Sequence, residues 1–169
     1  MLDWISLKEF NLDVDKSKLV DEYKTVNYLK LFELVSNFEE FIEERKINII
    51  LGSNTINAIA FYLACLNKEA IPLLISQNIK KNQLINYINR FSPFSIYSEG
   101  LLEIDNANHI TYEYSNLYFL KSNKKLTSKY PYLLLTTSGS TGNPKVVIVS
   151  KKNLISNTES IKQYLKINK

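Results

Sequence analysis

Short apolar runs alternate with segments of helical spacing between residues 47 and 97, and this alternation restricts the fold more than any other feature. Three runs are typical of strands: Ile47 to Leu51, which should be buried, Ala70 to Ile75, and Phe94 to Tyr97. Between them lie a segment that is apolar on nearly every side, Asn54 to Leu66, and an amphipathic segment, Lys81 to Phe91. The order strand–helix–strand–helix–strand predicts βαβ units. We therefore expect an α/β fold with a mostly parallel sheet flanked by helices.

Finer expectations concern single faces and positions of these elements. The helix over 81–91 should bury one face, made of Leu84, Ile85, Ile88 and Phe91. Pro72 lacks a backbone N–H, which favours an edge strand or an early position in the strand over 70–75. The nearly all-apolar helix should be buried, and Cys65 with it.

The flanking segments predict further elements. Apolar residues from Leu31 recur at helical spacing to about Glu44, whereas the first thirty residues resist assignment. Residues 111–114 and 117–120 read as short strands that could pair antiparallel, and 130–137 and 145–149 read as two more strands. Ser150 can cap a final helix. The apolar face of that helix would comprise Leu154, Ile155, Ile161 and Leu165.

Composition limits the class of protein. The 169 residues suit one globular domain, and 45% hydrophobic with 22% charged residues exclude disorder as the main state. No apolar run reaches the roughly 18 residues that a membrane span needs, and the N-terminus lacks the pattern of a secretory signal. A single cysteine excludes an internal disulfide, and the only histidine, His109, is expected at the surface. We expect a cytoplasmic protein without membrane contact.

The net charge of +4 is carried almost entirely by lysine, with only two arginines. Proteins that read base edges favour arginine, because its guanidinium binds guanine in a bidentate way. The lysines are scattered apart from a cluster at 121–129, which is typical of a solvated loop. Nucleic acid is therefore not the expected partner, although a basic nucleic-acid-binding protein stays as a third reading.

Two of the four glycines lie three residues apart in the segment Thr136-Thr137-Ser138-Gly139-Ser140-Thr141-Gly142-Asn143-Pro144-Lys145, between two predicted strands. Glycines let backbone N–H groups converge on an anion, hydroxyls donate further hydrogen bonds, and a lysine adds positive charge. These groups suit a polyphosphate, most simply ATP. The spacing is not that of a Walker A loop, and a plain hairpin of similar composition is the structural alternative.

The order of residues in this segment resembles the signature of the AMP-dependent synthetase/ligase (adenylate-forming) superfamily. The match to its TSGSTGxPK core runs from Thr137 to Lys145 without a mismatch. Asn153 and Leu154 also match, and looser similarity extends upstream to about Tyr28. Val146 and Lys151 depart from the family's usual glycine and histidine, which indicates a divergent branch.

The resemblance implies an enzyme that activates a carboxylate with Mg-ATP, releases pyrophosphate and forms an acyl-adenylate. The loop over 136–145 would then be the phosphate-binding loop. Its ATP-contacting residues would be Thr137, Ser138, Gly139, Ser140, Thr141, Gly142 and Lys145. Donors aimed at the departing pyrophosphate would favour that step.

The family's later motifs have no counterpart in residues 1–169, which would form a single incomplete N-terminal AMP-binding domain. We therefore expect no catalytic residue and no metal site here, and inactivity of this chain alone. The leading hypothesis is the N-terminal portion of an ATP-dependent acid–thiol or acid–amine ligase, acting on ATP and a carboxylate once further sequence completes it. The alternatives are a non-catalytic remnant or regulatory module, and a split-enzyme subunit that needs a partner chain or an oligomer.

Overall fold

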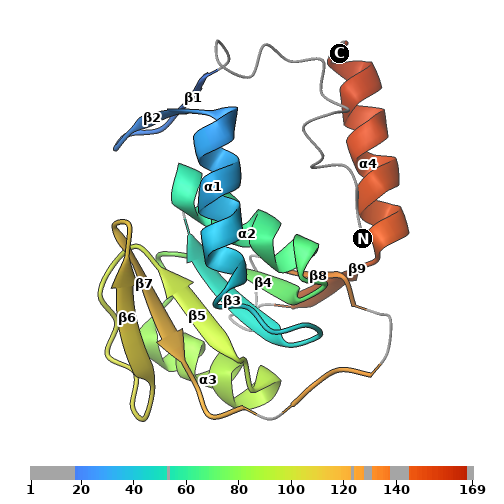
Figure 1. Ribbon diagram of the computed structural model, residues 1–169. Helices are drawn as coiled ribbons and strands as arrows, with labels where there is room; N and C mark the ends of the chain where they lie inside the picture. Colours follow the sequence, from blue (N-terminus) through green and yellow to red (C-terminus); the bar gives the residue numbers. More distant parts are fainter. Residues whose placement is uncertain (1–17, 53, 123, 128–130, 138–144, 167–169) are drawn as a thin grey trace.

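A seven-stranded sheet forms the centre of the molecule (Figure 1). The computed structural model describes residues 18–52, 54–122, 124–127, 131–137 and 145–166. Within these ranges the strand order is β6-β7-β5-β3-β4-β8-β9. The strands are β3 (Ile47–Gly52), β4 (Ile71–Ser76), β5 (Ser95–Ser98), β6 (Asn108–Tyr112), β7 (Ser115–Phe119), β8 (Leu133–Thr136) and β9 (Val146–Val149).

The middle of the sheet is parallel and its two margins are antiparallel. Strand β3 pairs in parallel with β4 and β5, and β4 pairs in parallel with β8. Strands β6 and β7 extend the sheet antiparallel at one margin, and β9 does so at the other. The expected α/β fold is confirmed, with a sheet that is parallel at its centre and mixed overall.

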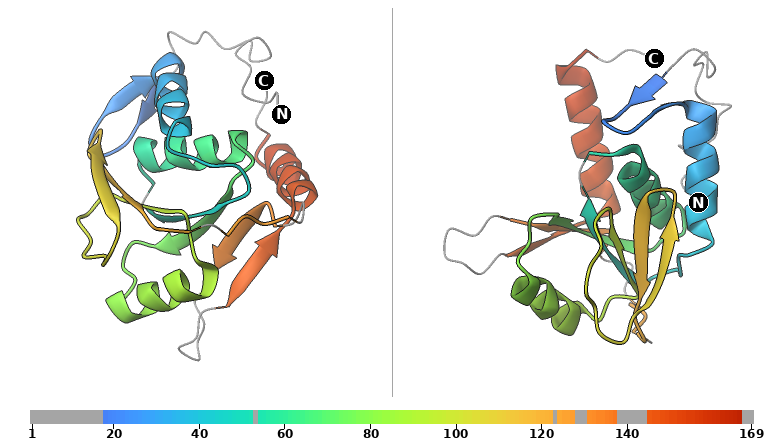
Figure 2. Two further views of the ribbon diagram at one scale, coloured as in Figure 1. Left: turned by 60° about the horizontal axis from the view of Figure 1, so that its bottom comes forward. Right: turned by 90° about the vertical axis from the view of Figure 1, so that its left-hand side faces the viewer.

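Helices cover both faces of the sheet (Figures 1 and 2). Helices α1 (Tyr28–Glu39) and α2 (Ile56–Asn67) lie on one face, and α3 (Lys81–Phe91) lies on the other. Each face has its own hydrophobic core: Phe38 and Phe61 pack on the α1–α2 side, and Ile49 and Leu73 on the α3 side. The alternating side chains of a buried parallel strand serve both cores, which explains the nearly continuous apolar runs in the sequence.

Pro72 lies in β4, at the centre of the sheet, so the expectation of an edge strand is wrong. The early position that the sequence also allowed is correct, because Pro72 is the second residue of β4. Ile71 donates its N–H to the Lys46 carbonyl on the β3 side, so alternation turns Pro72 toward β8. The pairing with β8 begins only at Leu73, and the missing N–H of proline therefore costs the sheet no hydrogen bond.

The N-terminal residues that resisted assignment form a small antiparallel hairpin of β1 (Lys18–Val20) and β2 (Thr25–Asn27). Asn27 then caps α1, because its side chain accepts a hydrogen bond from the Lys30 N–H. Helix α1 thus begins three residues earlier than the periodicity indicated, and it ends at Glu39.

The hairpin of β6 and β7 differs from the predicted strand over 111–114. Glu113 and Tyr114 both have positive φ angles, 49° and 67°, and they form the turn in place of the strand. Two-residue hairpin turns with positive φ at both positions usually contain Asn or Gly. Neither Glu113 nor Tyr114 is of these types, so the sequence did not predict a turn at these positions.

Helix α3 has the predicted bounds but a slightly different buried face. Leu84 and Tyr87 are buried, whereas Ile85 is 43% exposed. Positions 84, 87, 88 and 91 follow the i, i+3, i+4, i+7 spacing of one helix face, so Tyr87 replaces Ile85 in the predicted set.

Helix α4 (Lys151–Tyr164) begins as predicted, with Ser150 as its cap. Ser150 and Asn153 form a reciprocal capping box. None of the helix residues is buried, and Ile155 and Ile161 are exposed. The helix stands beside the sheet (Figure 1), so its predicted apolar face lacks the cover that the pattern implied.

Candidate functional site

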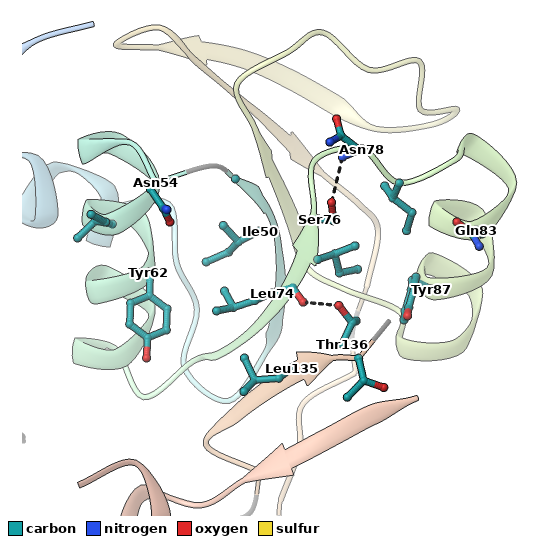
Figure 3. A pocket seen from close by; sticks show the side chains of 16 residues that line it. Ile50, Asn54, Tyr62, Leu74, Ser76, Asn78, Gln83, Tyr87, Leu135 and Thr136 are labelled. Atoms are coloured by element: carbon teal, nitrogen blue, oxygen red, sulfur yellow. Dashed lines mark hydrogen bonds between the residues drawn. The ribbon is translucent and has the colours of Figure 1, made fainter. Parts of the chain in front are cut away.

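A cleft of about 760 Å³ opens where the parallel strands β3, β4 and β8 end, between α2 and α3 (Figure 3). Ligands of α/β proteins bind at the carboxyl ends of parallel strands, because the loops and helix ends that follow the strands converge there. The cleft is lined by Ile50, Gly52, Asn54, Ala58, Ile59, Tyr62, Leu74, Ile75, Ser76, Asn78, Ile79, Gln83, Tyr87, Leu135, Thr136 and Thr137.

The two sides of this cleft differ in chemistry. On the side of α2 the lining is mainly apolar, with Ala58 and Ile59 from the helix and Leu74 from the sheet. Toward α3 it holds amide and hydroxyl groups, among them Asn78 and Gln83. A cleft of this kind can hold an organic group against an apolar wall and orient it by hydrogen bonds.

Two tyrosines face the cleft from opposite helices, Tyr62 from α2 and Tyr87 from α3 (Figure 3). Burial raises the pKa of Tyr62 to about 12, so its phenol is neutral at physiological pH. Burial also raises the pKa of Tyr87, and the nearby Arg90 opposes that effect. The Tyr87 side chain is buried, and its hydroxyl has no hydrogen-bond partner among the residues that the structure describes.

The start of α2, which forms one wall, is fixed by polar contacts to the N-terminal hairpin. Thr55 caps the helix through the Ala58 N–H. The Asp21 carboxylate accepts hydrogen bonds from the backbone N–H groups of Ile56, at 2.7 Å, and of Tyr23 and Lys24. Burial raises the pKa of Asp21, but the three backbone donors outweigh it and hold this pKa below 3.8.

Strand β8 leads to Thr137, the first described end of the predicted phosphate-binding loop, and Thr137 lines the cleft. The Thr136 hydroxyl donates to the Leu74 carbonyl at 3.1 Å, which ties the end of β8 to β4 (Figure 3). The Thr137 N–H then donates to the Lys145 carbonyl at 3.0 Å, one step beyond the last pair of the β8–β9 ladder. Thr137 and Lys145 therefore form the base of the loop, and Thr137 lines the cleft.

The predicted site residues Ser138, Gly139, Ser140, Thr141 and Gly142 lie outside the described residues. Of the predicted set the structure thus places Thr137 and Lys145, both exposed, next to one another across the hairpin base. The sequence did not indicate the cleft beside them. Its lining comes from several separate elements, and no local motif marks Tyr62, Gln83 or Tyr87 as neighbours.

Cys65 and His109 lie where the sequence predicted them, in the core and at the surface. Cys65 is fully buried in α2, and burial raises the pKa of its thiol. His109 is exposed, stacks on the Tyr118 ring with centroids 4.6 Å apart, and pairs its Nε2 with Asn116 Oδ1 at 2.9 Å.

In the ranges that the structure describes, no group of three or more His, Cys, Asp or Glu side chains could hold a metal ion. Over the same ranges, none of the helices is both long enough and apolar enough to cross a membrane.

Comparison with known proteins identifies relatives by sequence profile and by structure. The profile of the family described as AMP-binding enzyme matches residues 9–169. A search of curated protein sequences gave no match. Several solved structures share the fold.

Three of these structures illustrate the similarity. VinN in complex with 3-methylaspartate superposes with a TM-score of 0.68 at 13% identity, over 92% of this chain and 49% of that one. O-succinylbenzoate coenzyme A synthetase (MenE) from Bacillus subtilis, in complex with AMP, superposes with a TM-score of 0.62 at 17% identity, over 88% of this chain and 42% of that one. Fatty acyl-adenylate ligase from L. pneumophila, in complex with acyl adenylate and pyrophosphate, superposes with a TM-score of 0.61 at 17% identity, over 89% of this chain and 30% of that one. The chain thus spans less than half the length of these structural relatives.

Proposed function

Because the chain belongs to the family of AMP-binding enzymes, we propose that it is the N-terminal portion of an ATP-dependent ligase that activates a carboxylate as its acyl-adenylate. Its substrates are then Mg-ATP and a carboxylic acid, and pyrophosphate leaves. The proposal extends to the cytoplasm as the place of action and to a single N-terminal AMP-binding domain over residues 1–169.

One observation carries this proposal: the two described ends of the loop, Thr137 and Lys145, meet beside the cleft at the carboxyl edge of the parallel strands. A polyphosphate there lies within reach of the Lys145 ammonium, and an acid in the cleft lies next to it. In the proposed reaction the residues from Thr137 to Gly142, together with Lys145, bind the β- and γ-phosphates. Their donors stabilise the negative charge that develops on pyrophosphate as it departs.

Similarity to solved enzymes supports the same reading. One structural relative was solved with acyl adenylate and pyrophosphate and another with AMP, which are the products and the intermediate of such a reaction. At 17% identity, the similarity to these two structures establishes only the fold. That this chain shares in the activity of such enzymes is part of the proposal.

Calorimetric titration of the full chain with Mg-ATP tests the role of the loop. Lys145→Ala should weaken ATP binding by about tenfold or more, because a charged hydrogen bond to phosphate contributes roughly 1.5–3 kcal/mol. Lys68→Ala is the matched control, since Lys68 is exposed at the end of α2 and lines no part of the cleft. Equal affinity of the Lys145→Ala variant and the wild type would contradict the assignment of the loop.

Completion by further residues is the second part of the proposal. The chain corresponds to 30–49% of its structural relatives. We therefore expect no ATP–pyrophosphate exchange from these residues alone, and exchange once a chain that supplies the rest of the fold is added. Uncovered apolar residues of α4 and β9, among them Ile148 and Ile161, are consistent with such a partner or with an oligomer. A non-catalytic phosphate-binding module would bind ATP without gaining exchange.

A further inference from the structure

Helix α4 lacks the packing that a helix of its length needs. It stands beside the sheet (Figure 1), and none of its 14 residues is buried. Isolated helices of about 12–15 residues are marginal in water even when they are rich in alanine, and α4 contains no alanine. The cap at Ser150 stabilises only the first turn. We therefore expect a further segment to pack on this helix.

A groove of about 950 Å³ lies between α4 and the end of α2. Apolar side chains line it from three places in the chain: Leu66 of α2, Tyr132 just before β8, and Ile155 of α4. Ile155 is 42% exposed, so the wall on the side of α4 lacks cover. A volume of this size has room for several side chains.

The wall that α4 contributes is mainly basic. Lys151, Lys152 and Glu159 line the groove, and among the residues that the structure describes neither lysine forms an ion pair. The remaining polar groups of the lining are Glu44, Arg45, Glu69, Thr127 and Ser156. Glu44 is paired with Lys125 at 3.6 Å, so basic groups outnumber the acidic ones that remain. The groove therefore favours a segment with apolar side chains and an excess of acidic ones.

The segment that precedes β1 has this complementary composition. Residues 1–17 lie outside the described residues, and their sequence holds eight apolar side chains, Trp4 and Phe10 among them. It also holds four acidic side chains against two lysines. Seventeen residues can extend over about 55 Å, which exceeds the diameter of about 40 Å expected for a domain of this size. The segment can therefore reach the groove from Lys18, where the described chain begins.

We infer that residues 1–17 dock into the groove between α4 and the end of α2. Their apolar side chains pack against Tyr132 and Ile155, and their acidic side chains lie near Lys151 and Lys152. The inference does not depend on the proposed function, because it concerns a different surface from the cleft.

Docking of this segment also bears on neighbouring elements. Ser150 alone separates α4 from β9, so a segment that holds α4 also steadies the hairpin of β8 and β9. Ile161 follows Ile155 by six residues and therefore points about 120° away from it around the helix. That side of α4 stays available to a partner chain.

Tryptophan fluorescence of the full chain tests the inference, because Trp4 is the only tryptophan. In native buffer its emission should be blue-shifted, and its quenching by acrylamide several-fold weaker, relative to the protein in urea. Ile155→Asp should remove most of both differences, since it places a carboxylate in the apolar contact and near acidic side chains. Ile85→Asp is the matched control and should leave them unchanged, because Ile85 is 43% exposed on α3 and lies outside the groove.

A nitroxide label tests proximity without disturbing the apolar contact. Ser156→Cys provides an exposed attachment point in the groove, whereas the native Cys65 is fully buried and is not labelled in the folded protein. The label on Ser156→Cys should quench Trp4 emission several-fold. The same label on Asn86→Cys, at an exposed position of α3, should not.

Equal emission and quenching of Trp4 in native buffer and in urea would overturn the inference. A blue-shifted emission that neither Ile155→Asp nor the label at position 156 alters would also overturn it, since Trp4 would then be buried elsewhere. A blue shift that appears only as the protein concentration rises would assign the groove to a second copy of the chain instead. These measurements involve neither ATP nor an acid, so their outcome is separate from that of the proposed function.

Discussion

Gly52, the last residue of β3, lies where α2 passes close to the sheet. A Cβ atom at this position would come within 2.9 Å of Ala58 Cβ, in the first turn of α2. Such a distance forces the helix or the strand to shift. The absence of a side chain at Gly52 therefore lets α2 approach β3 closely enough to form one wall of the cleft.

Gly52→Ala should lower the free energy of unfolding by about 1–3 kcal/mol, because the added methyl group overpacks the contact with Ala58. Urea denaturation measures the effect. Gly100→Ala is the control: an added Cβ there would meet no heavy atom within 4 Å, so stability should stay the same or rise slightly. An unchanged free energy of unfolding in Gly52→Ala would show that α2 can move away from β3 without loss of stability.

At the residue scale, the sequence predicts a phosphate-binding loop from Thr137 to Lys145, which stays a prediction, and it does not indicate the cleft that Thr137 lines. The loop residues are consecutive, so a motif from Thr137 to Lys145 can be read directly. Tyr62, Gln83 and Tyr87 line the cleft only because β3, β4 and β8 are neighbours in the sheet. That proximity depends on strand order, which a single sequence does not reveal.

At the element scale, α2 depends on a residue far from it in the chain. Asp21 accepts the backbone N–H of Ile56, and its negative charge lies at the N-terminal end of the helix, where the helix dipole favours it. The contact also fixes the β1–β2 hairpin against the start of α2. A single carboxylate thus joins two elements through residues that lie 35 positions apart in the sequence.

Asp21→Asn should lower the free energy of unfolding by about 1 kcal/mol at neutral pH, because a charged hydrogen-bond acceptor is lost from the helix start. The folded-state pKa of Asp21 is depressed below 3.8. Its contribution is therefore present above that pH and is lost as the pH falls through the folded-state pKa. The difference in the free energy of unfolding between the wild type and Asp21→Asn should therefore disappear as the pH falls.

Urea titrations from neutral pH down to the acid limit of the folded state check this prediction. Glu40→Gln is the control, since Glu40 is exposed at the end of α1. If the difference in the free energy of unfolding between the wild type and Asp21→Asn stays constant with pH, the stabilisation does not come from the charge of the Asp21 carboxylate.

The sequence predicted the elements of residues 47–98 well, since their hydrophobic spacing reflects burial on two faces. It failed where tertiary contacts decide. The β1–β2 hairpin is too short to show a period, and the turn at Glu113 and Tyr114 lacks the usual residues. Helix α4 has the predicted spacing and cap, yet Ile155 and Ile161 remain exposed, because spacing shows which face a helix can bury and not whether another element covers it.

At the scale of the whole molecule, the sheet separates two hydrophobic cores, and Cys65 lies in the core on the α1–α2 side. The thiol is fully buried, and burial raises its pKa, which disfavours the reactive thiolate. Reagents can therefore reach it only when the packed face of α2 opens.

Cys65 should react with an aromatic disulfide reagent at least about a thousandfold more slowly in the native protein than in urea, since the opening free energy of a packed core approaches the global stability. The rate of thiolate release in native buffer and in urea provides the measurement. Native reaction at a rate near that in urea would show that α2 detaches locally from the sheet.

The two walls of the cleft are anchored in different cores: Ala58 of α2 belongs to one, and Tyr87 of α3 belongs to the other. The width of the opening is therefore set jointly by packing on both faces of the sheet. A substitution deep in either core, distant from the lining residues, would widen or narrow it. The shape of the cleft can consequently drift through evolution while every described lining residue stays unchanged.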